Sequence, residues 1–223
     1  FIHFGFLPVS SGAKNGGMEK PKISSFKIIL GSSSMARRKI LAEMGYQFSI
    51  VTADIDEQSI RKDTPEELVT VLAEAKADAI LEKLQRMDGV PEENGCPTLL
   101  ITADTVVVYK GVVQEKPTSE IEARQFIEGY SGSHGAVVGS VLVTNLTTGK
   151  KKGAWERAEV YFHEIPKEVI DSLVKEEVTY RVAGGLMLEH PLTSRFVESV
   201  VGNIDTVMGL PIALTEELIA EVL

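Results

Sequence analysis

The stretch "FKIILGSSSMARRKIL" (residues 26–41) joins a short apolar run to a glycine, three serines and two arginines. The run at 27–30 predicts a buried strand, and the pattern at 36–45, closed by Gly45, predicts a helix. Backbone amides at such a helix start, together with the helix dipole, form a site for anions. The serine hydroxyls can donate to a phosphate, and Arg37 can make a two-pronged contact with it. The competing interpretation is a serine N-cap followed by two arginines that face solvent.

Strands and helices alternate along the rest of the chain. Apolar periodicity and turn residues predict strands at 48–56, 98–109, 136–145, 156–165 and 195–202, and helices at 65–84, 119–130, 166–177 and 215–223. Lys110–Gly111 predicts a hairpin after the third strand, "TTGKKKG" (147–153) predicts a turn between the next two, and 86–97 reads as a loop. Some strands are joined by helices and others by turns. The pattern therefore predicts an α/β protein with a mixed β-sheet flanked by helices.

Composition and charge narrow the class of protein. The chain has 223 residues, of which 43% are hydrophobic and 25% charged, as in ordinary globular domains. The formal net charge of −9 argues against broad binding of nucleic acid, and no apolar run approaches the ~20 residues that cross a bilayer. A single cysteine, Cys96, excludes an internal disulfide. We expect a cytoplasmic protein whose partner is a small molecule rather than a nucleic acid or a membrane.

The first residues differ in character from the rest. Met18 begins "MEKPKISSFKIIL", and the residues before it match neither a secretory signal nor an organellar transit peptide. We expect residues 1–24 to be a disordered leader or residues added during cloning, and 25–223 to form a single domain.

Two groups of carboxylates stand out. Asp104 interrupts the apolar run "TLLITADTVVVY" (98–109), where a carboxylate is costly unless it is paired, bound to a metal or exposed. Such a residue is a candidate general base or metal ligand, although it can also cap a turn at a sheet edge. The segment "DIDE" (54–57) follows a predicted strand, and alternation places Glu57 on the side opposite its two aspartates. Carboxylates of this kind suit Mg²⁺ or Mn²⁺, whereas the ordinary interpretation is a polar exit from the strand.

Three further charged residues have two interpretations each. Lys76 lies one turn after Leu72, beside the apolar face of the helix at 65–84, and Lys116 follows the predicted hairpin. Glu189 follows a glycine-bearing stretch. Each can face a shared cleft, but most lysines and glutamates are plain surface residues.

The motifs, in this order, resemble the Maf family of nucleoside triphosphate pyrophosphatases. Members of this family are also called septum formation protein Maf-like, and they are related to the inosine triphosphate pyrophosphatases. The resemblance runs from about residue 26 to the end of the chain. It is carried by "ILGSSSMARRKIL" (29–41), "DIDE" (54–57), "LAEAKADA" (72–79), "ITADTVV" (101–107), "GVVQEKP" (111–117), "YSGSHGAVV" (130–138), "VAGGLMLE" (182–189) and "VMGLPI" (207–212).

This resemblance implies two lobes around a central cleft, in which a nucleoside triphosphate is hydrolysed to a nucleoside monophosphate and pyrophosphate. Asp104 corresponds to the proposed base of the family, and Glu57 and Asp104 would supply the carboxylates for metal and water. The implied metal is Mg²⁺ or Mn²⁺, with Co²⁺ as a further candidate. The residues that would bind the substrate phosphates are Ser32, Ser34, Arg37, Lys76 and Lys116. An enzyme of this size is also consistent with a homodimer, by analogy.

The positions linked to base specificity give a mixed pattern. Ala36 stands where the family has arginine in dTTP/UTP pyrophosphatases and tryptophan in the 7-methyl-GTP group, and Met35 replaces a family proline. Thr105 is similar to the dTTP/UTP group, whereas Glu189 is similar to the 7-methyl-GTP group. We expect dTTP/UTP or modified nucleotides in a house-cleaning role, with 7-methyl-GTP as the alternative.

Two rival functions stay open on sequence grounds. "DIDEQ" (54–58) resembles the Asp-x-Asp start of haloacid-dehalogenase-type phosphatases, but no later Gly-Asp-x-x-x-Asp follows. A nucleotide-binding regulator of cell division without strong catalysis is the non-enzymatic rival. The products released from a nucleoside triphosphate separate all three functions.

Overall fold

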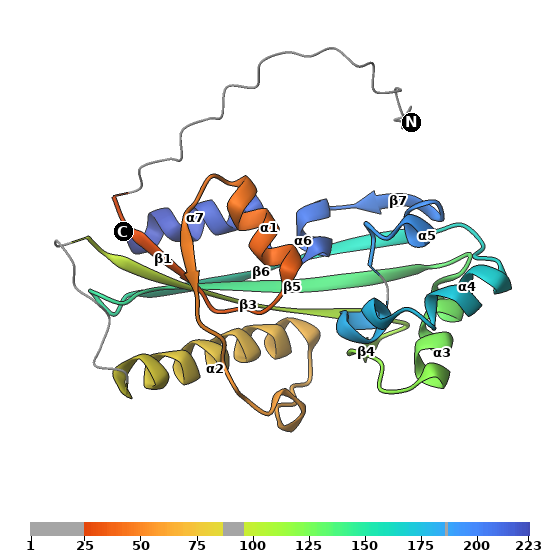
Figure 1. Cartoon of the computed structure of the whole chain (residues 1–223), viewed down its shortest axis with the longest axis horizontal. Helices are drawn as coiled ribbons and strands as arrows, with labels where there is room; N and C mark the ends of the chain where they lie inside the picture. The colour runs from red at the N-terminus through yellow and green to blue at the C-terminus, as the bar shows by residue number, and fades with distance from the viewer. Residues whose placement is uncertain (1–24, 87–95, 186) are drawn as a thin grey trace, which may run out of the picture.

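Seven strands from the described residues form one mixed sheet in the computed structural model, which describes residues 25–86, 96–185 and 187–223. The predictions for residues 1–24, and most of the loop at 86–97, lie outside the described residues. The strands are β1 Lys27–Leu30, β2 Phe48–Ile50, β3 Thr98–Tyr109, β4 Val112–Gln114, β5 His134–Asn145, β6 Lys151–Phe162 and β7 Val197–Val201. The longest of them, β3, β5 and β6, run side by side through the length of the molecule (Figure 1).

The order of the strands is β2-β1-β3-β5-β6-β7, and β4 pairs with β3 beyond the end of β1. β1 is parallel to both β2 and β3, whereas β3, β5, β6 and β7 are successively antiparallel. The sequence prediction of an α/β protein with a mixed, helix-flanked sheet is confirmed. Pairing with β1 covers β3 at 98–101, and pairing with β4 covers it at 107–109. Between these two partners, the edge of β3 at 102–106 has no neighbouring strand among the described residues.

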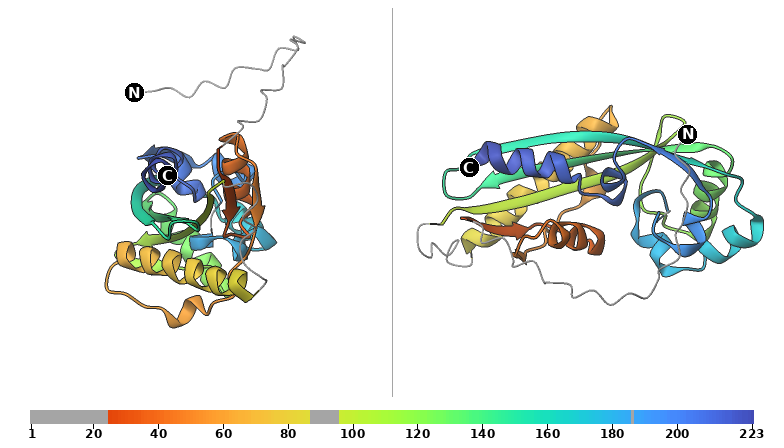
Figure 2. Two further views of the ribbon diagram at one scale, coloured as in Figure 1. Left: turned by 90° about the vertical axis from the view of Figure 1, so that its left-hand side faces the viewer. Right: turned by 90° about the horizontal axis from the view of Figure 1, so that it is seen from above.

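Helices cover both faces of the sheet. They are α1 Met35–Glu43, α2 Pro65–Arg86, α3 Glu120–Tyr130, α4 Lys167–Leu173, α5 Pro191–Ser194, α6 Ile204–Met208 and α7 Ile212–Val222, with short 3₁₀ segments η1 Glu57–Ser59, η2 Glu177–Arg181 and η3 Ala183–Gly185. α2 lies along one face, below the sheet in Figure 1, and α1 and α7 lie on the other face. The left view in Figure 2 shows the same separation.

Alternation along β3 explains this arrangement, because successive side chains point to opposite faces of a sheet. Leu100 and Val106 pack against α2, whereas Ile101 packs in the cluster with α1 and α7. Further along the second face, Val107 packs against a different cluster, built by α3 and α4. The second face therefore carries two separate helix groups, and Thr105 lies between their contacts on β3. The division of the domain into two lobes stays a prediction.

Several predicted boundaries are wrong. The strand predicted at 48–56 ends at Ile50, because its partner β1 ends at Leu30 and no other strand in the described part of the chain pairs with the backbone that follows. The helix predicted at 166–177 ends at Leu173, where the hydroxyl of Thr179 donates to the carbonyl of Leu173 at 2.6 Å and satisfies one of its terminal acceptors.

Other corrections concern the C-terminal half. β6 begins at Lys151 inside the predicted turn "TTGKKKG", because the turn itself is shorter. The side chain of Asn145 accepts from the backbone amides of Thr147 and Thr148 at 3.0 and 3.1 Å and closes it. The last helix begins at Ile212, directly after a proline, rather than at 215. Within the described residues, no helix is both long and apolar enough to cross a membrane.

Candidate active site

A cavity of about 1320 Å³ opens beside the uncovered edge of β3. The residues that the resemblance assigned as base, phosphate ligand, metal ligand or specificity residue line it: Ser32, Ser34, Ala36, Arg37, Glu57, Lys76, Asp104, Thr105, Lys116 and Glu189. They come from α1, η1, α2, β3 and the segments after β4 and η3. The fold thus brings together residues that lie more than a hundred positions apart. Their individual roles stay predictions.

The loop from β1 to α1 enters this cavity under tight steric control. The amide of Gly31 donates to the carbonyl of Ile101 at 2.7 Å, and a Cβ on Gly31 would lie 2.6 Å from the side chain of Thr102. Only glycine fits this close approach without displacing its neighbours. Ser34 is the N-cap of α1, where its hydroxyl accepts from the amide of Arg37 at 3.4 Å. The N-cap and the anion-binding geometry of a helix start therefore coexist in one loop.

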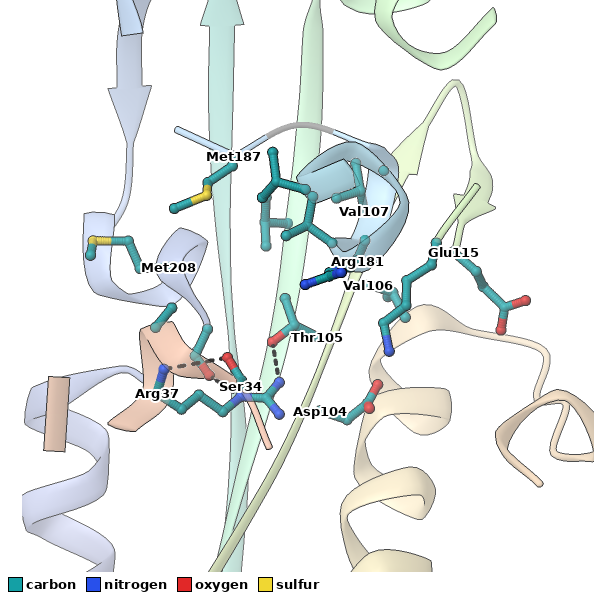
Figure 3. Close-up of a pocket in the computed structure, with 18 of the residues that line it drawn as sticks. Ser34, Arg37, Asp104, Thr105, Val106, Val107, Glu115, Arg181, Met187 and Met208 are labelled. Atoms are coloured by element: carbon teal, nitrogen blue, oxygen red, sulfur yellow. Dashed lines mark hydrogen bonds between the residues drawn. The ribbon is translucent and has the colours of Figure 1, made fainter. Parts of the chain in front are cut away.

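Arg37 is fixed by three protein acceptors and does not face solvent as a free side chain. Its Nε donates to the carbonyl of Gly209 at 2.8 Å, Nη2 donates to Thr105 Oγ1 at 3.0 Å, and Nη1 donates to Ser32 Oγ at 3.3 Å. Figure 3 shows the contact with Thr105 at the base of the cavity. A guanidinium has five N–H donors, so some remain for a ligand. Burial lowers the pKa of Arg37, and the charges of Asp104 and Glu57 oppose that shift.

Lys76 connects two carboxylates on the other side of the cavity. Its side chain projects from α2 and is 11% exposed. The ammonium makes an ion pair and hydrogen bond with Asp104 Oδ1, and it lies 3.1 Å from Glu57 Oε1. Asp104 is 6% exposed, while the Glu57 side chain is 42% exposed at the mouth. A buried cation between two carboxylates is the pattern of a charged functional site rather than of an apolar core.

Burial raises the pKa of Asp104, and the positive charges of Lys76 and Arg37 oppose this shift. Desolvation is the larger effect because the ionised form loses most of its contact with water. A carboxylate with a raised pKa is a stronger base than an exposed one. The environment of Asp104 is therefore suited to accept a proton.

The remaining predicted residues lie toward the rim. Lys116 and Glu189 are exposed while lining the cavity, and Ala36 is half-buried in the first turn of α1. The first two carboxylates of "DIDE" do not line the cavity. Asp54 and Asp56 are exposed, and the side chain of Asp56 accepts from the amide of Gln58 at 3.2 Å as the N-cap of η1. This placement disfavours the phosphatase interpretation, which needs the aspartates as nucleophile and acid.

The donor set fits a divalent metal that is shared with a phosphate ligand. Among the described residues, no cluster of three His, Cys, Asp or Glu side chains is arranged to bind a metal ion. Glu57 and Asp104 both approach the ammonium of Lys76, so the two carboxylates lie near each other on either side of it. Mg²⁺ is commonly bound by one or two carboxylates together with substrate phosphates and waters. Two carboxylates are therefore enough only if the ligand supplies further oxygen atoms.

Several cavity residues were not assigned from the sequence. Gly209 supplies the carbonyl that accepts from Arg37, and it lies in "VMGLPI", a motif noted without a role. Met187 and Met208 lie on one wall, and Arg181 lies between that wall and Glu115 on the opposite side (Figure 3). Nothing in the sequence indicated a role for Arg181 except its position directly before the motif "VAGG". Its Nη2 donates to Glu177 Oε2 at 2.5 Å on the surface of η2.

Comparison with known proteins agrees with this geometry. The family described as Maf-like protein matches residues 27–222. A 7-methyl-GTP pyrophosphatase of Dictyostelium discoideum is 36% identical over 200 residues, which cover 90% of this chain and 99% of the relative. A dTTP/UTP pyrophosphatase of Bacillus cereus is 32% identical, covering 86% of this chain and 94% of the relative, and one of Syntrophus aciditrophicus is 30% identical, covering 87% and 89%. With its motifs gathered in one cavity and the family match extending over nearly all of the described chain, this protein belongs to the Maf family.

Proposed function

We propose that this protein is a nucleoside triphosphate pyrophosphatase that hydrolyses the bond between the α and β phosphates. The observation that carries the proposal is the convergence of Lys76, Asp104 and Glu57 in the same cavity as the fixed guanidinium of Arg37. The names of the relatives, 7-methyl-GTP pyrophosphatase and dTTP/UTP pyrophosphatase, carry the same activity. The proposed products are a nucleoside monophosphate and pyrophosphate.

The triphosphate would bind where donors and cations gather. Arg37 is held by its three acceptors, so a phosphate oxygen meets a guanidinium that is already oriented. Ser32 and Ser34 lie at the start of α1, where the helix dipole favours an anion. Lys116 has no ion pair among the described residues and supplies an exposed positive charge at the rim. These groups together offset the charge of a polyphosphate in a chain whose net charge is −9.

Asp104 is the proposed general base. Its Oδ atom accepts a proton from a water molecule as the water oxygen forms a bond to the α phosphorus. The bond from the α phosphorus to the bridging oxygen breaks, and its electron pair leaves with pyrophosphate. Lys76 contacts Asp104, and its positive charge favours the ionised carboxylate against the opposing effect of burial. Arg37 stabilises the negative charge that accumulates on the phosphate oxygens.

Glu57 and Asp104 are the residues that would bind Mg²⁺ or Mn²⁺ together with phosphate oxygens. A bound divalent ion supplies charge neutralisation and orientation of the phosphates. Lys76 makes ion pairs with both carboxylates, so its positive charge would partly neutralise the negative charge that acts on the metal ion.

The base preference remains between two groups of nucleotides. The hydroxyl of Thr105 accepts from Arg37, which supports a role for Thr105 at the proposed phosphate end of the cavity. Glu189 is exposed and is the residue in which this chain is similar to the 7-methyl-GTP group. The names of the relatives likewise include both a 7-methyl-GTP pyrophosphatase and dTTP/UTP pyrophosphatases. We propose dTTP, UTP and 7-methyl-GTP as the substrates to compare first.

The test is a screen for pyrophosphate release from canonical and modified nucleoside triphosphates, with Mg²⁺, Mn²⁺ and Co²⁺ in separate arms. The wild-type protein is expected to release one pyrophosphate for each monophosphate. Asp104→Asn keeps the shape of the side chain but removes the base, and it is expected to lower kcat by about 10²-fold or more. Glu43→Gln, which changes a carboxylate on the exposed end of α1, is the matched control and should leave kcat unchanged.

Three outcomes would overturn the proposal. Release of orthophosphate alone would indicate a phosphatase. Unchanged turnover in Asp104→Asn would remove the assigned base. Absence of turnover across the whole panel with every metal, combined with measurable nucleotide binding, would favour a nucleotide-binding regulator.

A further inference from the structure

The cavity extends well beyond its charged end, into a region lined by apolar side chains. Val107 and Val137 from the sheet line this region, together with Met187 and Leu188 from the segment after η3. Tyr130, at the end of α3, lines it as well. We define these five residues as the inner chamber.

Among the five residues of the inner chamber, Tyr130 has a polar side-chain atom, its hydroxyl, in an unusual environment. The side chain is 1% exposed, and its hydroxyl has no hydrogen-bond partner in the described part of the chain. Its ring is packed edge-on against Tyr109, with centroids 5.6 Å apart and an angle of 86°. A buried hydroxyl without a partner is costly, and native proteins rarely retain one without a reason.

Gly184 and Val107 lie close to this hydroxyl. A Cβ built on Gly184 would lie 2.8 Å from Tyr130 Oη and 2.7 Å from a methyl group of Val107, so η3 approaches both groups closely. Gly184 has φ +66°, which glycine adopts without strain. The Tyr130 hydroxyl therefore lies in a narrow space between η3 and the side chain of Val107. Burial also raises the pKa of Tyr130, which keeps the hydroxyl protonated and able to donate.

The inner chamber lies at a suitable position relative to the phosphate end. Thr105 and Val107 are two residues apart on β3, so they face the same side at a separation of about 7 Å. Thr105 accepts from Arg37, and Val107 flanks the Tyr130 hydroxyl. A ligand whose phosphates contact Arg37 would therefore place a ribose and a base toward the inner chamber. Thioether and aliphatic side chains suit the faces of a base.

We propose that the inner chamber binds the nucleobase and that the Tyr130 hydroxyl donates a hydrogen bond to a keto oxygen of the base. This oxygen is bound to C6 of a purine or C4 of a pyrimidine, the positions at which adenine and cytosine carry an amino group. This inference rests on the proposed function and adds a specificity-determining residue to it. The bases in the relatives' names, 7-methylguanine, thymine and uracil, all carry such an oxygen.

Matched pairs of substrates test the proposal. ITP and ATP differ at C6 of the purine, and UTP and CTP differ at C4 of the pyrimidine, with keto and amino groups in each case. The wild-type protein is expected to favour the keto member of each pair, and Tyr130→Phe is expected to reduce that preference in kcat/KM about tenfold. Tyr109→Phe makes the same change on the adjacent ring, which does not line the cavity, and should leave the preference unchanged.

Stability and binding measurements keep the test independent of turnover. The Tyr130 hydroxyl has no partner in the described chain, so the melting temperature of Tyr130→Phe without nucleotide should be equal to or above that of the wild type. The Kd values of the same four nucleotides, measured in EDTA, should show the same keto preference and its loss.

Each remaining outcome has one meaning. Equal effects of Tyr130→Phe on all four nucleotides, or an unchanged ratio in both kcat/KM and Kd, would overturn the role of Tyr130 while leaving pyrophosphate release intact. Absence of pyrophosphate release from the wild type would instead contradict the proposed function, and the Kd ratios would still decide whether Tyr130 recognises a keto base.

Discussion

Replacing Lys76 by methionine tests whether the buried ion pair determines the electrostatics of the site. Methionine has a similar length and no charge, so Lys76→Met leaves the Asp104 carboxylate buried without its direct partner. The Lys76 and Asp104 side chains are 11% and 8% exposed, which places the pair in the buried class, where removal of one partner costs about 3–5 kcal/mol. We expect a loss of this size in the free energy of unfolding at pH 7.

The pH dependence sets an independent upper limit on this loss. Asp104 can avoid the penalty by taking up a proton. From its ordinary pKa of 3.8, protonation costs at most about 4.4 kcal/mol at pH 7 and about 1.6 kcal/mol at pH 5. A carboxyl whose pKa is raised on folding contributes stability that is complete below 3.8 and is lost as the pH rises through the folded pKa. The difference between Lys76→Met and the wild type should therefore shrink as the pH falls.

Urea denaturation followed by circular dichroism, in EDTA at pH 7 and pH 5, measures both effects. With an m-value of about 2 kcal/mol/M, the midpoint of Lys76→Met should fall by ~2 M at pH 7 and by much less at pH 5. The double variant Lys76→Met/Asp104→Asn should be more stable than Lys76→Met alone, and Glu57→Gln, at the exposed mouth, should cost less than about 1 kcal/mol. The reasoning would be refuted if the stability losses of Lys76→Met and Asp104→Asn added up in the double variant to within about 0.5 kcal/mol. It would also be refuted if Lys76→Met lost the same stability at pH 7 and at pH 5.

Two further predictions follow from single hydrogen bonds. Thr105→Val removes the acceptor for Arg37 Nη2 while keeping the shape of the side chain, so kcat/KM should fall about 10- to 100-fold while the protein stays folded. Thr105→Ser keeps the acceptor and should retain most activity, and equal activity in the two variants would contradict this role. Burial raises the pKa of Tyr46 to about 12, and the hydrogen bond that Tyr46 donates to Glu216 contributes to this shift. The absorbance of Tyr46 should therefore titrate near pH 12 in the wild type and at a lower pH in Glu216→Gln. Because this pKa is raised on folding, the contribution of Tyr46 to stability is complete below its ordinary value of 10.0 and is lost as the pH rises through about 12. A Tyr46 titration that Glu216→Gln leaves unchanged would contradict the assigned contact.

The β-sheet of this protein was predictable where local pattern and pairing agree. The apolar run at 98–109 became β3 with the predicted bounds, because a long β-rich stretch in the centre of a sheet is stabilised by neighbours on both sides. The stretch at 48–56 failed for the opposite reason. Its local pattern is strand-like as far as 56, but β1 offers backbone partners only as far as Leu30. The lengths of edge strands depend on their partners, which local periodicity does not contain.

The candidate site was predictable as a set of residues and not as a set of contacts. Asp104 was conspicuous because a carboxylate in an apolar strand needs compensation, and Lys76 lay beside the apolar face of a long helix. That Lys76 provides the compensation follows only from the packing of α2 across β3. The carbonyl of Gly209, which fixes Arg37, had no signature in residue type because every residue carries such a carbonyl.

The sequence by itself determined the alternation of strands and helices, the family and the chemical identity of the groups in the cavity. These features follow from side-chain chemistry and short-range periodicity. The tertiary structure alone decided that Arg37 is clamped between Thr105 and Gly209, and that the Tyr130 hydroxyl lies buried without a partner against Gly184. Both outcomes depend on which distant segments pack together, and hydrogen-bond satisfaction in a folded interior is a property of that packing rather than of any local stretch.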